Sequence, residues 1–66
     1  MKIKIAEVRK ARGIKQKDLC VAADISKKYL IDLEQGRQDN PTIKTLLRVA
    51  AALGVKVADI VDFEGA

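Results

Sequence analysis

The chain has 66 residues, of which 48% are hydrophobic and only 3% aromatic, and its formal net charge is +4. One cysteine and no histidine exclude, within a single copy, an internal disulfide, zinc sites of the usual ligand types and catalysis by a cysteine–histidine or serine–histidine pair. So short a chain predicts one domain, residues 1–66, without room for a large catalytic cleft, and we expect no enzymatic activity, metal or cofactor.

The apolar residues recur at helical rather than alternating spacing, which predicts an all-α fold. We expect the first helix over residues 4–12, because Ile5 and Val8 share a face and Gly13 supplies a C-terminal cap. The second helix is expected over residues 16–23. Its apolar face would consist of Leu19, Cys20 and Ala23.

A three-residue turn, residues 24–26, separates the second helix from the third. Asp24 tolerates the left-handed conformation that such a turn needs, and Ser26 is a favourable N-cap. The third helix is expected over residues 27–35, followed by Gly36 as its stop. The residues expected to point inward are Ile25, Leu30 and Leu33. At 100° per residue, the residues on the opposite side are Lys28, Ile31, Asp32 and Gln35, with Lys27 and Tyr29 on the flanks.

The rest of the chain predicts a polar loop and two further helices, five in all. The loop covers residues 37–41, and Thr42 can cap a fourth helix that ends at Gly54. The apolar face expected for the fourth helix consists of Ile43, Leu46, Leu47, Ala50 and Leu53. A last short helix is expected to contain Val57, Ile60 and Val61.

Positive charge is concentrated in the first half of the chain. Residues 1–37 hold ten basic and five acidic groups, whereas residues 38–66 hold three basic and four acidic groups. This imbalance is typical of a protein that binds a polyanion, although it also suits an ordinary soluble surface. Lys27 and Lys28 favour the polyanion, because at a helix N-terminus each opposes the helix dipole by ~0.3–1 kcal/mol. A negatively charged partner would offset that cost.

The sequence predicts two short helices joined by a three-residue turn, and the second has a polar outer face. These are the features of a helix-turn-helix that reads DNA. Short motifs along the chain support this interpretation. They are Val8-Arg9, Gly13-Ile14, Lys15-Gln16, Asp18-Leu19-Cys20, Ile25-Ser26, Leu33-Glu34-Gln35-Gly36, Asn40-Pro41-Thr42-Ile43, residues 45–55 and Asp59-Ile60-Val61. In this order and spacing they resemble the phage-repressor-like helix-turn-helix family of the Cro/CI or XRE type. The resemblance implies a compact, five-helix, lambda-repressor-like DNA-binding domain.

The sequence departs from the family's usual pattern at three positions. Asp24 stands where the family most often has glycine. Lys56 replaces a small N-cap residue, so we expect the last helix to fray. Asp32 stands where the family often places an arginine or glutamine that faces DNA, and a carboxylate there could accept from the amino group of cytosine or adenine.

The resemblance also implies roles for individual residues. Gln16 would contact a phosphate and brace the third helix. The residues that would contact base edges or adjacent phosphates are Lys27, Lys28, Tyr29 and Asp32. The DNA backbone would be met by Arg37, Asn40 and Thr42, the last through free N–H groups at a helix N-terminus. Arg9 and Glu34 would form an ion pair that joins the first and third helices.

By the same resemblance, the expected function is a sequence-specific, DNA-binding transcriptional regulator. We expect a small homodimeric repressor or restriction-modification controller type of protein, without a separate ligand-sensing domain, that binds double-stranded DNA at two half-sites. The last two helices and the tail around Phe63 would form the dimer interface, since they lie in the less basic half. The rival interpretation is an antitoxin-like protein that uses this fold to bind a partner protein.

The sequence also indicates where the protein works. No apolar run approaches the ~18 residues that a membrane span needs, and the start has no apolar signal region. A lone cysteine is typical of a reducing compartment. We therefore expect a cytoplasmic protein that has no membrane association and no small-molecule ligand.

Overall fold

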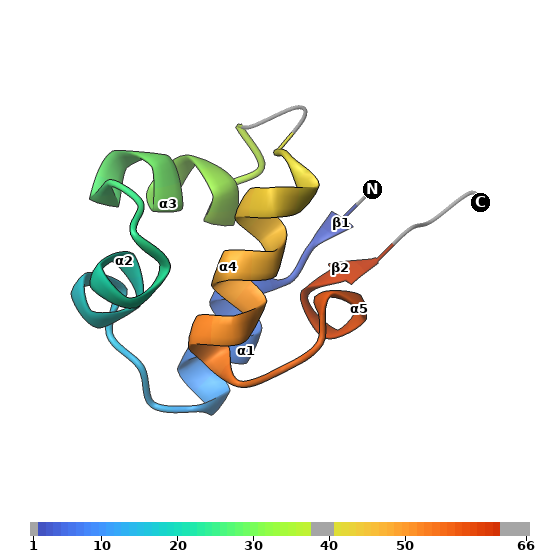
Figure 1. The fold of residues 1–66 in the computed structure, drawn as a ribbon, viewed down its shortest axis with the longest axis horizontal. Coiled ribbons are helices and arrows are strands. Elements are labelled where there is room, and N and C mark those ends of the chain that lie inside the picture. Colours follow the sequence, from blue (N-terminus) through green and yellow to red (C-terminus); the bar gives the residue numbers. More distant parts are fainter. Residues whose placement is uncertain (1, 38–40, 63–66) are drawn as a thin grey trace.

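The computed structural model describes residues 2–37 and 41–62. Within these residues the chain forms five helices and a pair of two-residue strands (Figure 1). In chain order the elements are β1 (Lys2–Ile3), α1 (Ile5–Ala11), α2 (Gln16–Ala23), α3 (Lys27–Glu34), α4 (Ile43–Leu53), α5 (Val57–Ile60) and β2 (Val61–Asp62). The five predicted helices are confirmed, with ends that differ by at most one residue.

Side-chain caps and left-handed residues set the helix boundaries where the sequence predicts them. The Ser26 hydroxyl accepts from the Tyr29 N–H at 3.1 Å, and the Thr42 hydroxyl accepts from the Thr45 N–H at 3.1 Å. Each hydroxyl satisfies one of the N–H groups that a helix start leaves without a partner. Asp24 has φ 56° and ends α2 in the left-handed conformation expected of it.

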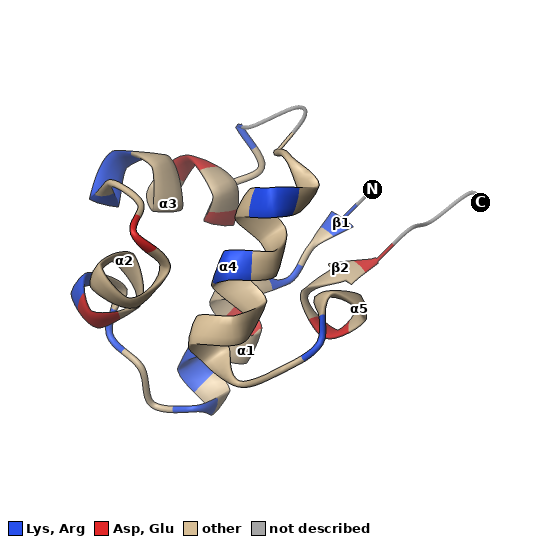
Figure 2. Cartoon of the chain, viewed as in Figure 1, with Lys and Arg blue, Asp and Glu red and all other residues tan. Residues whose placement is uncertain are grey.

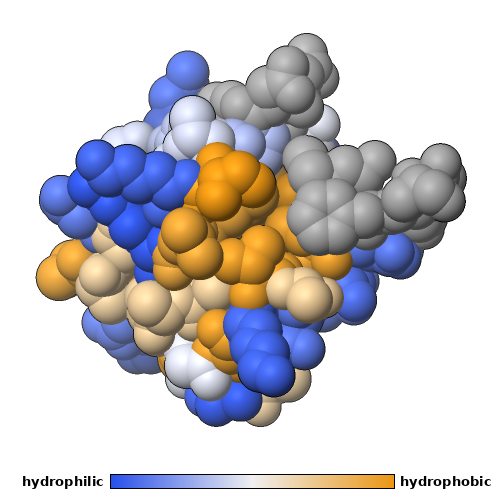
Figure 3. Space-filling view, turned by 45° about the vertical axis from the view of Figure 1, so that its right-hand side comes forward, coloured by the Kyte–Doolittle hydropathy of each residue, from blue (hydrophilic) through white to orange (hydrophobic). Residues whose placement is uncertain are grey.

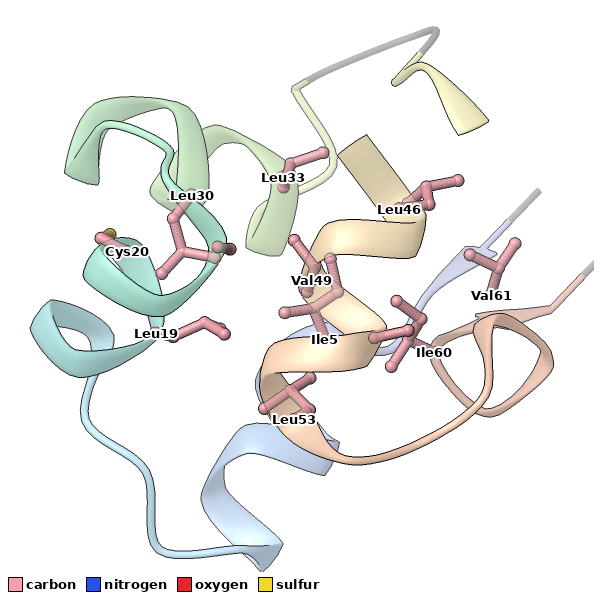
Figure 4. Packing of buried hydrophobic residues seen from close by; sticks show 12 residues of the cluster. Ile5, Leu19, Cys20, Leu30, Leu33, Leu46, Val49, Leu53, Ile60 and Val61 are labelled. Carbon is pink, nitrogen blue, oxygen red and sulfur yellow. The ribbon is translucent and has the colours of Figure 1, made fainter. Parts of the chain in front are cut away.

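The core surrounds α4, which runs through the middle of the molecule with α2 and α3 on one side and α5, β1 and β2 on the other (Figure 1). Leu19, Leu30 and Leu33 approach α4 from the first side and Ile60 from the second (Figure 4). Burial of these apolar side chains is the main stabilising term for so small a fold. Among the described residues, the buried apolar set is Ile5, Leu19, Cys20, Ala23, Leu30, Leu33, Leu46, Val49, Ala50, Leu53, Ile60 and Val61.

The apolar face predicted for α4 is wrong at two positions. Ile43 and Leu47 are 61% and 54% exposed, whereas Val49, which lies outside the predicted face, is fully buried. The buried side of α4 is formed by Leu46, Val49, Ala50 and Leu53, whose spacing follows 3.6 residues per turn. Ile43 and Leu47 lie beside this face rather than on it.

The chain ends differ from the all-helical prediction. β1 and β2 pair antiparallel, with Lys2 opposite Asp62 and Ile3 opposite Val61. Val61 therefore belongs to a strand and not to the last helix, and the Lys4 N–H, which precedes α1, donates to the Ile60 carbonyl at 2.7 Å.

The expected fraying of α5 is not what the structure shows at its start, because the Lys56 N–H donates to the Asp59 carboxylate at 3.0 Å. That contact closes one half of a capping box across the first turn of the helix. Among the described helices, none is long and apolar enough to cross a bilayer.

Candidate nucleic-acid interface

Helices α2 and α3 and the turn between them form one unit. The Ile25 N–H donates to the Cys20 carbonyl at 3.0 Å, which closes the turn onto the end of α2. Leu30 and Leu33 are fully buried and fix the inner side of α3 against the core. The opposite side of α3 consequently faces solvent along the edge of the molecule (Figure 1).

A buried polar network joins α1, α2 and α3. Arg9 Nε donates to Glu34 Oε2 at 2.7 Å, and Arg9 Nη2 donates to Glu34 Oε1 at 3.4 Å. Gln16 Nε2, at the start of α2, donates to Glu34 Oε1 at 2.9 Å. The side chains of Arg9 and Glu34 are only 11% and 8% exposed, so these bonds form largely away from water. The predicted ion pair is confirmed.

The same network also fixes the loop between α1 and α2. Arg9 Nη1 donates to the carbonyl of Ile14 at 2.9 Å. One guanidinium thus holds the loop while its other nitrogens hold the end of α3. Gln16 braces α3, as the resemblance implies.

The outer side of α3 begins with positive charge. Lys27 and Lys28 are exposed in the first turn, and that turn contains no acidic residue (Figure 2). Both ammonium groups therefore lie near the positive end of the helix dipole. Tyr29 is half-buried and packs against the core cluster, so its ring covers the edge of the core as well as bordering the outer face.

The end of α3 carries an ion pair that was not predicted, between Asp32 and Arg37. Gly36, with φ 74°, turns the chain so that its N–H donates to the Leu33 carbonyl and the Arg37 N–H donates to the Asp32 carbonyl, at 3.3 and 2.8 Å. These two bonds form a Schellman motif. The motif brings Arg37 Nη1 to 3.6 Å from Asp32 Oδ1, and the two side chains are 67% and 19% exposed.

This pair changes the surroundings expected for Asp32. Its carboxylate is mostly covered and lies beside a guanidinium, whereas a residue that reads bases on its own would present a free acceptor. The sequence contains the signal for this pair. In a Schellman motif that ends at Gly36, Asp32, three residues before the helix cap, lies next to Arg37, which follows the glycine.

The chain from residue 5 to residue 60 matches the family model described as helix-turn-helix. It belongs to the helix-turn-helix family, of the XRE type. The match includes all five helices and the three residues of the buried network.

Curated helix-turn-helix relatives include two regulators. The chain is 42% identical over 59 residues to the HTH-type transcriptional regulator DdrOP3 of Deinococcus deserti, covering 89% of this chain and 45% of the relative. It is 43% identical over 61 residues to the immunity repressor protein of Bacillus phage phi105, covering 92% of this chain and 42% of the relative. The chain therefore spans less than half the length of these relatives.

A solved helix-turn-helix structure has the same fold. The structure of SinR, described as the master regulator for biofilm formation and solved in complex with DNA, superposes with a TM-score of 0.80 at 36% identity. The superposition covers 88% of this chain and 92% of the SinR chain.

In this helix-turn-helix domain the predicted contact residues form three groups. One is the exposed start of α3, with Lys27, Lys28 and the half-buried Tyr29. Another is the Asp32–Arg37 pair at the end of that helix. The remaining described residues, Gln16 and Thr42, lie at the N-termini of α2 and α4. Asn40 lies outside the described residues.

Proposed function

We propose that this chain is the DNA-binding domain of a sequence-specific transcriptional regulator, in which α3 enters the major groove. The observation that carries the proposal is the exposed, doubly cationic start of α3, held to α1 and α2 by the buried network of Arg9, Gln16 and Glu34. A recognition helix must be accessible to DNA and held at a fixed angle to the rest of the domain, and α3 meets both requirements.

Lysine and hydrophobic side chains on α3 can serve direct readout. Lys27 or Lys28 can donate to guanine O6 and N7, and the half-buried Ile31 can meet a thymine methyl group. Tyr29 would border these contacts. Phosphates would be bound by Gln16, Arg37, Asn40 and the N-terminal N–H groups of α4 next to Thr42.

A homodimer that binds two half-sites is the form in which such a domain reaches useful specificity. One recognition helix reads only a few base pairs, and two-fold symmetry doubles the contacts. The names of the relatives support a regulatory role, one being a transcriptional regulator and another an immunity repressor. We therefore favour a repressor or a small controller protein that acts on double-stranded DNA.

A second candidate function is an antitoxin-like protein that binds a partner protein through this fold. The exposed side chains of Ile43 and Leu47 favour it, since apolar groups at a surface suit a protein partner. The two functions differ in their response to salt. Binding to DNA releases counterions and weakens steeply as salt rises, whereas apolar protein contacts do not.

The test is selection of duplexes from a random DNA library with the purified chain, followed by binding of the selected sequence at several salt concentrations. We expect enrichment of a two-half-site sequence. Lys28→Ala should weaken binding by ~5- to 150-fold if this lysine reads a base, equivalent to ~1–3 kcal/mol, and relax preference at one position per half-site. Lys56→Ala, an exposed lysine next to α5, is the matched control. If no sequence is enriched, and any remaining binding of the chain to DNA does not weaken as salt rises, the result contradicts DNA reading and supports the protein-partner alternative.

A further inference from the structure

A cluster of exposed basic residues lies where the C-terminal end of α1 meets the C-terminal end of α4. A Cβ atom placed on Gly54, the cap of α4, would lie 3.6 Å from Arg12 Nη1, so the Arg12 guanidinium lies against this end of α4. Three exposed lysines stand within three residues of that contact along the chain, namely Lys10, Lys15 and Lys56. These four cations are called the end patch below.

The end patch carries charge of one sign. No aspartate or glutamate occurs in residues 10–15 or 54–58, and the nearest carboxylates along the chain are Glu7, Asp18 and Asp59. In the part of the chain that the structure describes, neither of the two ion pairs includes a cation of the end patch. Figure 2 shows basic residues at the end of α1 and in the loop before α5, and Figure 3 shows that hydrophilic surface also borders the apolar area of the neighbouring face.

The fold accounts for only two of these four cations. Lys10 and Arg12 lie at the C-terminal end of α1, where a cation complements the helix dipole. Lys15 and Lys56 are the N-cap residues of α2 and α5, where a cation opposes the dipole. A lysine side chain also has no acceptor for the N–H groups of a first turn. As at the start of α3, a negatively charged partner would offset this cost.

The end patch and the start of the loop from α3 lie at opposite ends of α4. The helix begins directly after that loop and runs for 11 residues, ~16 Å, before it reaches Gly54 (Figure 1). DNA is stiff over the length of a binding site. A duplex bound by α3 therefore leaves the end patch uncovered.

The phosphate backbone of DNA is the polyanion that suits this surface best. A protein partner usually requires an apolar or aromatic anchor that becomes buried at the centre of the contact. The large exposed hydrophobic residues of the described chain are Val21, Ile43 and Leu47, and all three lie outside the end patch. Phosphates need no such anchor, since lysines bind them as point charges without reading the sequence.

We propose that the end patch binds the phosphate backbone of a second DNA duplex, independently of its sequence, while α3 reads the first. One chain then bridges two duplexes or two distant segments of one DNA molecule. The bridge rests on the proposed function for its first duplex, whereas the contact of the end patch with phosphates does not.

The first test measures the end patch in a chain whose recognition helix is weakened by Lys27→Gln and Lys28→Gln. This chain should still bind a duplex of arbitrary sequence. Adding Lys10→Gln and Lys56→Gln should make the slope of log K against log salt less steep by ~2, about one for each cation removed. Equal slopes before and after this addition would overturn the proposal.

The matched control adds Lys2→Gln and Arg48→Gln to the same weakened chain. Both residues are exposed cations outside the end patch, and their removal changes the net charge by the same amount. The control should leave the slope unchanged, and a change as large as that of the end-patch variant would reduce the effect to net charge alone. Circular dichroism checks that every variant remains folded.

The second test measures bridging. A duplex with one selected half-site is fixed to beads, and a labelled duplex of unrelated sequence is added with the chain. The amount of chain on the beads reports binding by α3, and the amount of labelled duplex per chain reports the end patch. Lys10→Gln with Lys56→Gln should leave the first amount unchanged and remove most of the second.

The remaining outcomes each contradict a different part of the proposal. If the end-patch variant retains the labelled duplex as well as the unchanged chain does, two α3 helices of paired copies hold the two duplexes. If the variant weakens binding to the bead-bound duplex, the end patch contacts the first duplex. If polyglutamate binds the end patch and the unrelated duplex does not, the partner is an acidic protein. If no chain binds the bead-bound duplex, the proposed function fails, and the first test still decides on the end patch.

Discussion

Asp32 shows how a residue's neighbours change the role expected for it. The sequence predicts an acceptor that faces base edges, whereas in the structure its carboxylate lies 3.6 Å from the Arg37 guanidinium and is mostly covered. The Schellman turn at Gly36 produces this pairing. We therefore expect Asp32 to orient Arg37 toward the DNA backbone instead of reading a base itself.

This expectation is tested by a double-mutant cycle on the selected duplex. Asp32→Asn should weaken binding by about two- to fivefold, since an ion pair whose arginine is 67% exposed contributes only ~0.2–1 kcal/mol. Arg37→Ala should weaken binding at least as much, because it also removes the proposed phosphate contact. The double variant should be no weaker than Arg37→Ala, because Asp32 would act only through Arg37. If Asp32→Asn instead changes sequence preference even in the Arg37→Ala background, Asp32 reads a base directly.

At the scale of helices, Glu34 is the residue on which three elements converge. It accepts from Arg9 of α1 and from Gln16 of α2, and it is the last residue of α3. Removing one partner of a buried ion pair leaves the other charge without compensation in a site that excludes water. The angle of α3 relative to the rest of the domain should therefore depend on this carboxylate.

We expect Arg9→Ala or Glu34→Ala to lower the free energy of unfolding by ~3–5 kcal/mol, because both side chains are about nine-tenths buried. Arg37→Ala is the matched control, since it breaks an arginine–carboxylate pair at the surface and should cost no more than ~1 kcal/mol. Urea denaturation followed by circular dichroism measures all three. Equal losses in buried and exposed pairs would contradict the role given to the network.

The helices could be predicted because their boundaries rest on local chemistry. Ser26 and Thr42 cap their own helices, and Asp24 adopts the turn conformation expected of it. The face of α4 could not be fixed in the same way. Ile43, Leu47 and Val49 are all apolar, and only the tertiary packing decides which of them the core covers.

Contacts between distant parts of the chain set the limit of prediction for the ends and for the site. The pairing of β1 with β2 joins the two ends of the described chain, Lys2 with Asp62 and Ile3 with Val61, and two-residue strands give no periodic signal. In the site, the family resemblance predicted the Arg9–Glu34 pair and the bracing of the third helix by Gln16, but the structure was needed to show that Gln16 does so through Glu34.

At the scale of the whole molecule, the uneven distribution of charged residues along the sequence can be located in the structure. The start of α3 carries two exposed lysines on one side of α4, while the acidic residues Asp59 and Asp62 lie with α5 and β2 on the other (Figure 2). Lys2, which pairs opposite Asp62, and Lys56, next to α5, also lie on this second side, so its charge is mixed. A polyanion would be attracted most to the start of α3, whose first turn holds two lysines and no acidic residue.

The measurement that tests the central claim most directly is amide chemical-shift mapping by NMR with a duplex that contains one selected half-site. A single half-site keeps effects of pairing between copies out of the result. We predict that the largest shifts occur at the amides of residues 27–32 and of Gln16, with little change in α5. If the duplex binds while the amides of α3 stay unchanged, α3 is not the recognition helix and the proposed DNA-binding face is wrong.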